Sequence, residues 1–227
     1  DNSYYIDHFA KQGKDVEQFL SEVFGRKKRY LIDSDKENSL TMALNAVESA
    51  LKKADLTGED IDMIIYSSCL PEYVVPPSSI HVHHAINGKK QCICFDINAV
   101  CAGMTVCLDM VNRYMQTSDV IKRALIVGAD YVNILLKPTS EFCYGHYGDA
   151  SCAIILEKTD EDCGILGTKC YVNSSEHNNI LFPGCGTSKI PKTDNKEQWL
   201  LNWVPFENVS LGRAYQSMTE LLEENNL

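Results

Sequence analysis

One cysteine of the ten in this chain of 227 residues stands at a place that favours thiol chemistry. Residues 92–97 are apolar and β-prone, which predicts a buried strand, and apolar side chains recur at helical spacing from Met104 to Met115. Cys101 therefore lies at a predicted strand-to-helix turn, where free helix amides and the helix dipole favour a nucleophilic thiolate. The alternative interpretation is a packed small hydrophobe, because free cysteines are among the most buried residues.

Other residues that could do chemistry form weaker patterns. His81 and His84 lie three apart on a predicted helix over residues 78–86, but no acidic residue beside them completes a ligand set. Cys92 and Cys94 alternate within the predicted strand, and no Cys-x-x-Cys pair occurs. We therefore expect no metal site.

A cysteine protease is a further alternative. Cys101 with His146 or His177 supplies the right residue types, but such pairs arise often by chance and their surroundings here are wrong for that class.

Composition and charge exclude several classes of protein. The net charge of −10 would repel nucleic-acid phosphates, so no nucleic-acid partner is expected. No apolar run approaches the ~20 residues of a membrane span, so no membrane association is expected either. The cysteines fall inside apolar strands and helices, which favours reduced thiols and a cytoplasmic location.

The predicted elements alternate between helices and strands. The acidic turn between the last two strands predicts that they form an antiparallel pair. This order indicates an α/β domain whose mixed, five-stranded sheet is covered by helices on both faces. Two short helices are expected before residue 25, and longer helices are expected over 39–54, 78–86 and 211–222 and after Cys101. Strands are expected over 61–68, 92–97, 123–129, 151–157 and 164–172. A loop region is expected over 173–202.

Four segments in this order resemble the β-ketoacyl-acyl-carrier-protein synthase III family of the thiolase superfamily. Residues 96–103, Asp-Ile-Asn-Ala-Val-Cys-Ala-Gly, resemble the family's active-cysteine segment, and residues 124–130 resemble the strand after the following helix. Residues 147–153 resemble the Phe-Gly-Asp-Gly-Ala-Gly-Ala element, and residues 25–30 resemble the Thr-Gly-Ile-Arg-Glu-Arg-His segment. The match is expected to cover the amino-terminal portion of such an enzyme.

The resemblance implies a thiolase-like fold, built from two pseudo-repeated halves in an α-β-α-β-α architecture and normally found as a homodimer. Residues 1–172 would form the amino-terminal thiolase-like domain, which is the first half without its opening strand. Residues 173–227 would form a connecting loop region and the first helix of a truncated second half.

The resemblance also implies an acyltransferase reaction in fatty acid or related acyl-chain biosynthesis. Cys101 would take an acyl group from acyl-coenzyme A or an acyl-carrier-protein thioester, and a malonyl thioester on acyl carrier protein would then be decarboxylated and condensed with it. No tightly bound cofactor and no metal are implied. The family's catalytic His and Asn would lie beyond Leu227, so this chain alone is expected to lack condensation. A non-catalytic thiolase-fold subunit that pairs with an active partner is the alternative.

The same resemblance points to residues that would bind the donor. Phe19 stands where the family has a Trp that stacks on the coenzyme A adenine, Lys27 aligns with an Arg that contacts the cofactor, and Arg29 matches an Arg directly. Glu141 replaces the second adenine-stacking residue, an Arg, and would repel the nucleotide's phosphates. Cys152 replaces a glycine and is expected to crowd the acyl tunnel.

Overall fold

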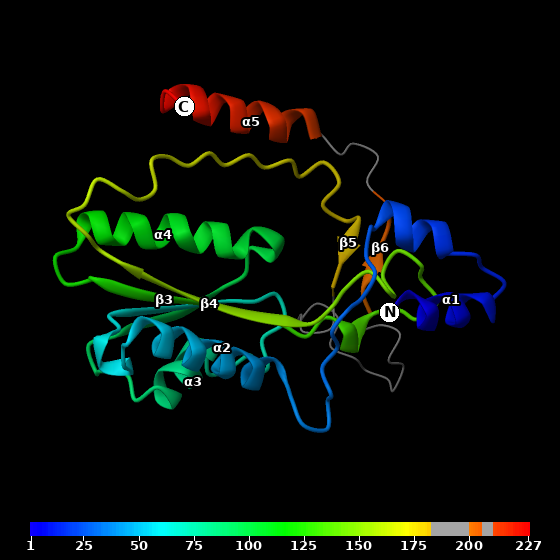
Figure 1. Ribbon diagram of the computed structural model, residues 1–227, viewed down its shortest axis with the longest axis horizontal. Coiled ribbons are helices and arrows are strands. Elements are labelled where there is room, and N and C mark those ends of the chain that lie inside the picture. The colour runs from blue at the N-terminus through cyan, green and yellow to red at the C-terminus, as the bar shows by residue number, and fades with distance from the viewer. Residues whose placement is uncertain (183–199, 206–210) are drawn as a thin grey trace.

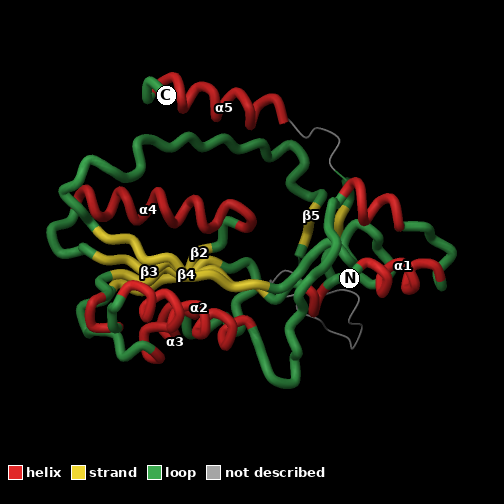
Figure 2. The backbone as a smooth tube through the Cα atoms, in the orientation of Figure 1, coloured by secondary structure: helices red, strands yellow, loops and turns green. Residues whose placement is uncertain are grey.

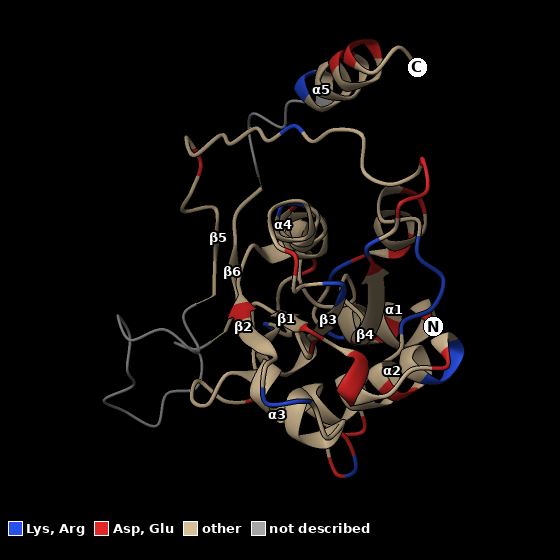
Figure 3. Cartoon of the chain, turned by 90° about the vertical axis from the view of Figure 1, so that its left-hand side faces the viewer, with Lys and Arg blue, Asp and Glu red and all other residues tan. Residues whose placement is uncertain are grey.

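The computed structural model describes residues 1–182, 200–205 and 211–227. At its centre is a mixed sheet of four strands (Figure 1), whose order β2-β1-β3-β4 can be followed in Figure 3. Strand β1 is parallel to β2 and to β3, with Met63 opposite both Ile93 and Ala124, and β4 returns antiparallel to β3. The strands are β1 (Met63–Ser67), β2 (Ile93–Ile97), β3 (Arg123–Asp130) and β4 (Ala150–Glu157).

Helices cover both faces of this sheet. Helices α2 (Ser39–Ala54) and α3 (Ser78–Ala85) pack on one face, and α4 (Gly103–Thr117) packs on the other (Figures 1 and 3). Strand β1 is buried along its whole length because alternate residues face the two layers. Ile64 and Tyr66 join the core under α2 and α3, whereas Met63 and Ile65 join the core under α4.

The beginning of the chain forms a smaller apolar cluster. Helix α1 (Asn2–Ala10) and the π-helix η1 (Phe19–Val23) are joined through Gly13, whose positive φ of 75° suits glycine. Tyr5, Phe9 and Leu20 are buried in this cluster, and Tyr144 from the segment before β4 packs against it. The two short helices predicted before residue 25 are thus confirmed, with the second one shortened and of the π type.

Helix α2 begins with a capping box, and the elements not yet named are short apart from the last helix. Asn38 caps α2: its side chain accepts from the Thr41 amide, and the Thr41 hydroxyl oxygen accepts from the Asn38 amide, at 2.8 and 2.9 Å. The other described elements are the 3₁₀ turns η2 (Gly58–Asp60), η3 (Val100–Ala102) and η4 (Asn133–Leu135), the paired strands β5 (Ile180–Leu181) and β6 (Asn202–Trp203), and helix α5 (Leu211–Glu224).

The prediction of a five-stranded sheet is wrong in the number of strands. Residues 164–172 form no strand beside β4 but run over the outer side of α4 (Figure 2). The Thr168 hydroxyl donates to Asp109 of α4 at 2.9 Å, and Lys169 forms ion pairs with Glu220 and Glu224 of α5. Strand propensity describes how a side chain fits a pleated surface and does not choose the partner, so side-chain bonds to two helices prevail here.

The predicted loop region over residues 173–202 lies partly outside the described residues. Within its described part, β5 pairs antiparallel with β6, with Ile180 opposite Trp203. The division of the chain at residue 172 stays a prediction. In the described part of the chain, every helix is too short or too polar to cross a lipid bilayer.

We predict that Gly103→Ala destabilises the fold by about 1–3 kcal/mol, because a Cβ at this first residue of α4 would lie 2.0 Å from the Ser67 hydroxyl oxygen of β1. The free energy of unfolding in urea measures the effect. Ser67→Ala should rescue Gly103→Ala, because only the Ser67 Cβ, 3.4 Å away, would then remain. Gly212→Ala is the matched control, since nothing lies within 4 Å of its added Cβ. Equal losses at both glycines would contradict this packing.

Candidate active site

Cys101 lies in η3, the single turn between β2 and α4, and its side chain is exposed. The turn is closed by amides on both sides of the cysteine. The Val100 amide donates to Asn98 Oδ1 at 3.2 Å, and the Ala102 amide donates to the Ala99 carbonyl at 3.1 Å. The Gly103 amide donates to the Val100 carbonyl. Within the described part of the chain, the Cys101 amide is not among the hydrogen-bond donors, so the turn leaves it available for a ligand.

The backbone at this turn is strained. Val100 has a φ of 49°, a left-handed conformation that is rare for a β-branched residue and costs about 1–3 kcal/mol. The strain is the consequence of a reversal between a strand and a helix within three residues. Gly103, the first residue of α4, packs closely on Ser67 at the end of β1.

A carboxylate at the end of β3 holds the loop that follows β1. Asp130 Oδ1 accepts from the Ser68 hydroxyl at 2.7 Å, from the Cys69 amide at 3.1 Å and from the Leu70 amide at 3.2 Å. Burial and the neighbouring Asp130 charge raise the pKa of the Cys69 thiol to about 12. Cys69 therefore stays protonated at neutral pH, although it lies near Cys101.

A second carboxylate holds the other end of the same loop. Asp96 of β2 accepts from the Ser78 and Ser79 amides, at 2.6 and 2.8 Å. These are the first amides of α3, where the helix dipole favours a negative charge. Residues 69–77 are thus anchored to β3 at one end and to β2 at the other.

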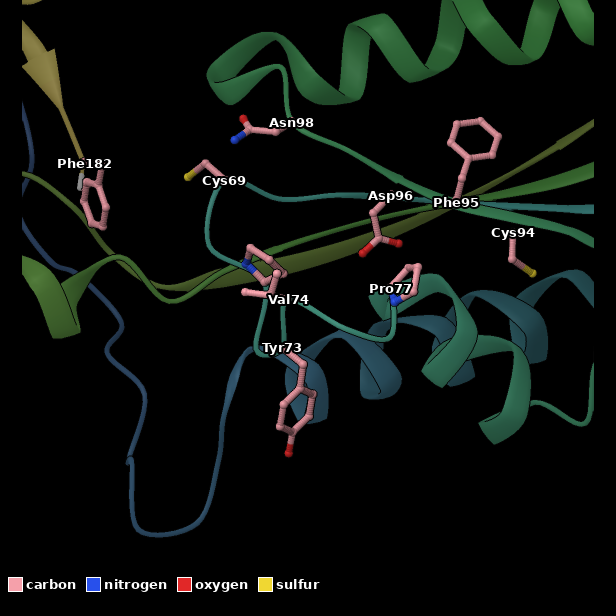
Figure 4. A pocket seen from close by; sticks show the side chains of 10 residues that line it. Cys69, Tyr73, Val74, Pro77, Cys94, Phe95, Asp96, Asn98 and Phe182 are labelled. Carbon is pink, nitrogen blue, oxygen red and sulfur yellow. The ribbon is translucent and has the colours of Figure 1, made fainter. Parts of the chain in front are cut away.

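A cavity of about 610 Å³ lies between this loop and β2 (Figure 4). Cys69 and Asn98 line it near the Cys101 turn, and Asp96 and Pro77 line it farther along β2. Cys101 itself does not belong to the lining. The cavity has both apolar and polar side chains in its lining, and Asn98, three residues before Cys101, is one of them.

A third carboxylate, that of Asp149, connects residues 30–32 with the segment just before β4, which is far away in the sequence. Asp149 is buried and accepts from the Ile32 amide at 2.9 Å and from the Asn133 side chain at 2.7 Å. Its own amide donates to the Tyr30 carbonyl at 2.9 Å, and a Cβ on Gly148 would approach that carbonyl to 3.2 Å. Residues 30–32 and 148–149 therefore run against each other.

Phe19 and Glu141, two of the residues discussed for donor binding, line one cavity of about 380 Å³. Phe19 contacts Phe142 edge to face, with ring centroids 5.5 Å apart. Glu141 forms an ion pair with Lys14, and this pairing lowers the pKa of the Glu141 carboxyl. Lys14 was not singled out in the sequence, and it neutralises the charge that Glu141 would otherwise present to a nucleotide.

The two basic candidates have different surroundings. Lys27 is exposed. Arg29 is half-buried, donates to the Gly145 carbonyl and to Asn2 Oδ1, and lies 4.6 Å from the Tyr5 ring centroid. Burial lowers the pKa of Arg29. Arg29 thus joins α1 to the segment before β4, and the roles of Phe19, Lys27 and Arg29 in donor binding stay predictions.

The histidines of the protease alternative are engaged elsewhere. His146 Nδ1 accepts from Arg26 at 3.0 Å, and burial lowers the pKa of His146 to about 4. His177 Nδ1 lies 3.1 Å from the Ser174 carbonyl. Within residues 1–182, 200–205 and 211–227, no hydrogen bond joins Cys101 to a histidine, so the geometry gives this alternative no support.

Comparisons with known proteins match the segment that contains Cys101. The profile of the family described as 3-oxoacyl-[acyl-carrier-protein (ACP)] synthase III matches residues 95–174, which include Cys101 and the Gly148–Asp149 element. The β-ketoacyl-[acyl-carrier-protein] synthase III of Bartonella henselae is 30% identical over 193 residues, covering 82% of this chain and 58% of that protein. The Clostridium perfringens (strain SM101) enzyme is 28% identical over 216 residues, covering 93% and 65%.

The resemblance to the synthase III family is confirmed. A crystal structure of the 3-oxoacyl-(acyl-carrier protein) synthase from Burkholderia xenovorans LB400 superimposes with a TM-score of 0.80 at 21% identity, over 98% of this chain and 64% of that one. This likeness shows the thiolase-like α/β fold. The chain spans less than two thirds of the length of these synthase III proteins.

We predict that iodoacetamide alkylates Cys101 well before Cys69 at pH 8. Cys101 is exposed, whereas the raised pKa of Cys69 leaves roughly one thiolate in 10,000 molecules at that pH. Peptide mass spectrometry of timed samples measures both rates. Asp130→Asn should speed labelling of Cys69, because it removes the charge that helps to raise the pKa. Asp96→Asn is the matched control, and an unchanged Cys69 rate in Asp130→Asn would contradict the assignment.

Proposed function

We propose that Cys101 accepts an acyl group from a thioester, as the first half of a decarboxylative condensation of the synthase III type. The exposed thiol at a strained strand-to-helix turn, within the segment that matches the family, is the observation that supports this most directly. Such a thiol can reach a bulky donor without any movement of the sheet.

The first step is a transfer between two thioesters. The Cys101 sulfur attacks the donor carbonyl carbon, the bond to the donor sulfur breaks, and the donor leaves as a free thiol that takes up the proton from Cys101. Since the product is again a thioester, its free energy is retained for the formation of a carbon–carbon bond. The free Cys101 amide at the turn would donate to the developing oxyanion.

The second step of the proposed reaction is the condensation itself. A malonyl thioester on acyl carrier protein loses carbon dioxide, and the resulting enolate carbon attacks the acyl group on Cys101. The β-ketoacyl thioester leaves on the carrier, and the cysteine sulfur recovers its proton. Acyl carrier protein and acyl-coenzyme A are therefore the proposed partners, in fatty acid or related acyl-chain biosynthesis and within a homodimer, in keeping with the synthase III relatives.

We predict that the full-length protein, incubated with acetyl- or octanoyl-coenzyme A or with the corresponding acyl carrier protein, gains one acyl group on Cys101. Intact-mass and peptide mass spectrometry measure the adduct and its position. Cys101→Ala should abolish it, whereas Cys163→Ala, which changes another exposed cysteine, should leave it unchanged. No adduct with any donor would support the alternative, a non-catalytic subunit in which Cys101 has no chemical role.

The cavity around Phe19 bears on the choice of donor. It is lined by two acidic residues, Asp15 and Glu141, and one basic residue, Lys14. Net negative lining disfavours the phosphates of a nucleotide. We therefore propose that acyl carrier protein, whose pantetheine arm carries no adenine nucleotide, is the preferred acyl donor, with Lys27 and the exposed part of the basic segment 26–29 guiding it.

We predict that Glu141→Gln raises acylation of Cys101 by acetyl-coenzyme A about fivefold, equivalent to ~1 kcal/mol, because it removes a negative charge and leaves Lys14 to meet the phosphates. Acetyl-pantetheine, which has no nucleotide, should react at an unchanged rate. Glu17→Gln alters an exposed acid outside this cavity and should change neither rate. Equal acceleration with both donors would refute the assignment of this cavity to a nucleotide.

A further inference from the structure

Three groups that bind soft metals converge on the outer edge of the sheet. His83 comes from the last turn of α3, Cys92 directly precedes β2, and Cys94 is its second residue. One ligand atom from each of the three lies within 4.8 Å of the others. All three side chains are half-buried, so a ligand from solvent has access.

The geometry of a strand explains why the two thiols lie together. Residues two apart in a strand point to the same face, so both thiols face α3, and their sulfurs lie 3.8 Å apart. The Cys94 thiol donates to Cys92 Sγ. The two sulfurs are therefore close enough together to bind the same ion.

The imidazole of His83 is held in a defined orientation. Its Nε2 lies 3.0 Å from the Lys89 carbonyl oxygen, which can only accept, so Nε2 carries the proton and Nδ1 keeps a free lone pair. A histidine that donates one ring N–H to a backbone carbonyl is the usual arrangement of a metal ligand. The backbone of Gly88 packs against the same ring, because a Cβ there would lie 2.5 Å from His83 Cδ2.

The charges near the cluster fit a cation. Lys89 forms an ion pair with Asp62 at 2.5 Å, which offsets its charge, and Asp96 faces Cys94 from farther along β2. The carboxyl end of α3 adds the negative end of a helix dipole. His81 and His84 take no part: His81 packs on Tyr73, with ring centroids 5.3 Å apart, and His84 is exposed.

We propose that His83, Cys92 and Cys94 form a binding site for zinc, with the fourth position open to solvent. Two sulfur ligands and one imidazole match the preference of zinc, whereas oxygen-seeking cations such as magnesium do not use them. The site tethers α3 to the edge strand β2. Cys94 lies on the opposite side of the 610 Å³ cavity from Cys69 and Asn98 (Figure 4), so the ion would take no part in acylation of Cys101.

The proposal is tested with the full-length protein, reduced and freed of metal, by titration with zinc against a chromophoric chelator. We expect one zinc ion per chain. Removal of a residue that hydrogen-bonds to a metal ligand typically lowers metal affinity roughly 10–100-fold. Cys92→Ser/Cys94→Ser removes two ligands and should therefore lower the zinc affinity by more than that. Cys163→Ser/Cys170→Ser, which removes two exposed thiols, is the matched control and should bind like the unaltered protein. Unchanged affinity in the Cys92/Cys94 variant would overturn the site.

Two further measurements keep the result independent of folding. Cobalt in place of zinc should give thiolate-to-metal charge-transfer absorption and the intense visible bands of four-coordinate geometry. His83→Gln should weaken the metal affinity and alter these bands while leaving the circular dichroism of the metal-free protein unchanged. Cobalt binding without charge-transfer absorption would overturn the proposal. Cys101→Ala should retain full metal binding, and loss of binding in that variant would instead place the metal at the acylation site.

Discussion

The contact between Gly103 and Ser67 is the constraint on which the arrangement of the active-cysteine turn depends. Because residue 103 has no side chain, the first residue of α4 can lie directly on the end of β1. This close approach fixes the start of the helix, which in turn forces the reversal through Val100 and exposes Cys101. An added Cβ at position 103 would clash with the Ser67 hydroxyl unless that side chain moved.

Three aspartates then hold the loops that surround this turn. Asp130 and Asp96 anchor the two ends of the loop after β1, and Asp149 joins residues 30–32 to the segment before β4. Each carboxylate accepts from at least one backbone amide outside the sheet: Cys69 after β1, Ser79 at the start of α3 and Ile32 in the segment before α2. The loops around Cys101 are therefore positioned by fixed hydrogen bonds and not only by packing.

The same architecture separates two kinds of cysteine chemistry. At the carboxyl end of β2 the strand ends in a turn that exposes one thiol alone, which suits acyl transfer. At the amino end of β2 two thiols share a face beneath α3 and meet an imidazole, which suits a metal ion. Strand β2 lies at the edge of the sheet in the described part of the chain, so both of its ends are accessible.

The sequence by itself determined the order of helices and strands, the turn that holds Cys101 and the family resemblance, because local periodicity and the spacing within one turn are written in consecutive residues. It placed α2 and strands β1 to β4 within a residue or two of their observed ends. Only the tertiary structure decided that residues 164–172 join helices instead of the sheet, that Lys14 pairs with Glu141, and that His83 and not His81 or His84 meets Cys92 and Cys94. These outcomes depend on which distant surfaces meet, and pairwise contacts between remote residues leave no periodic pattern in a single sequence.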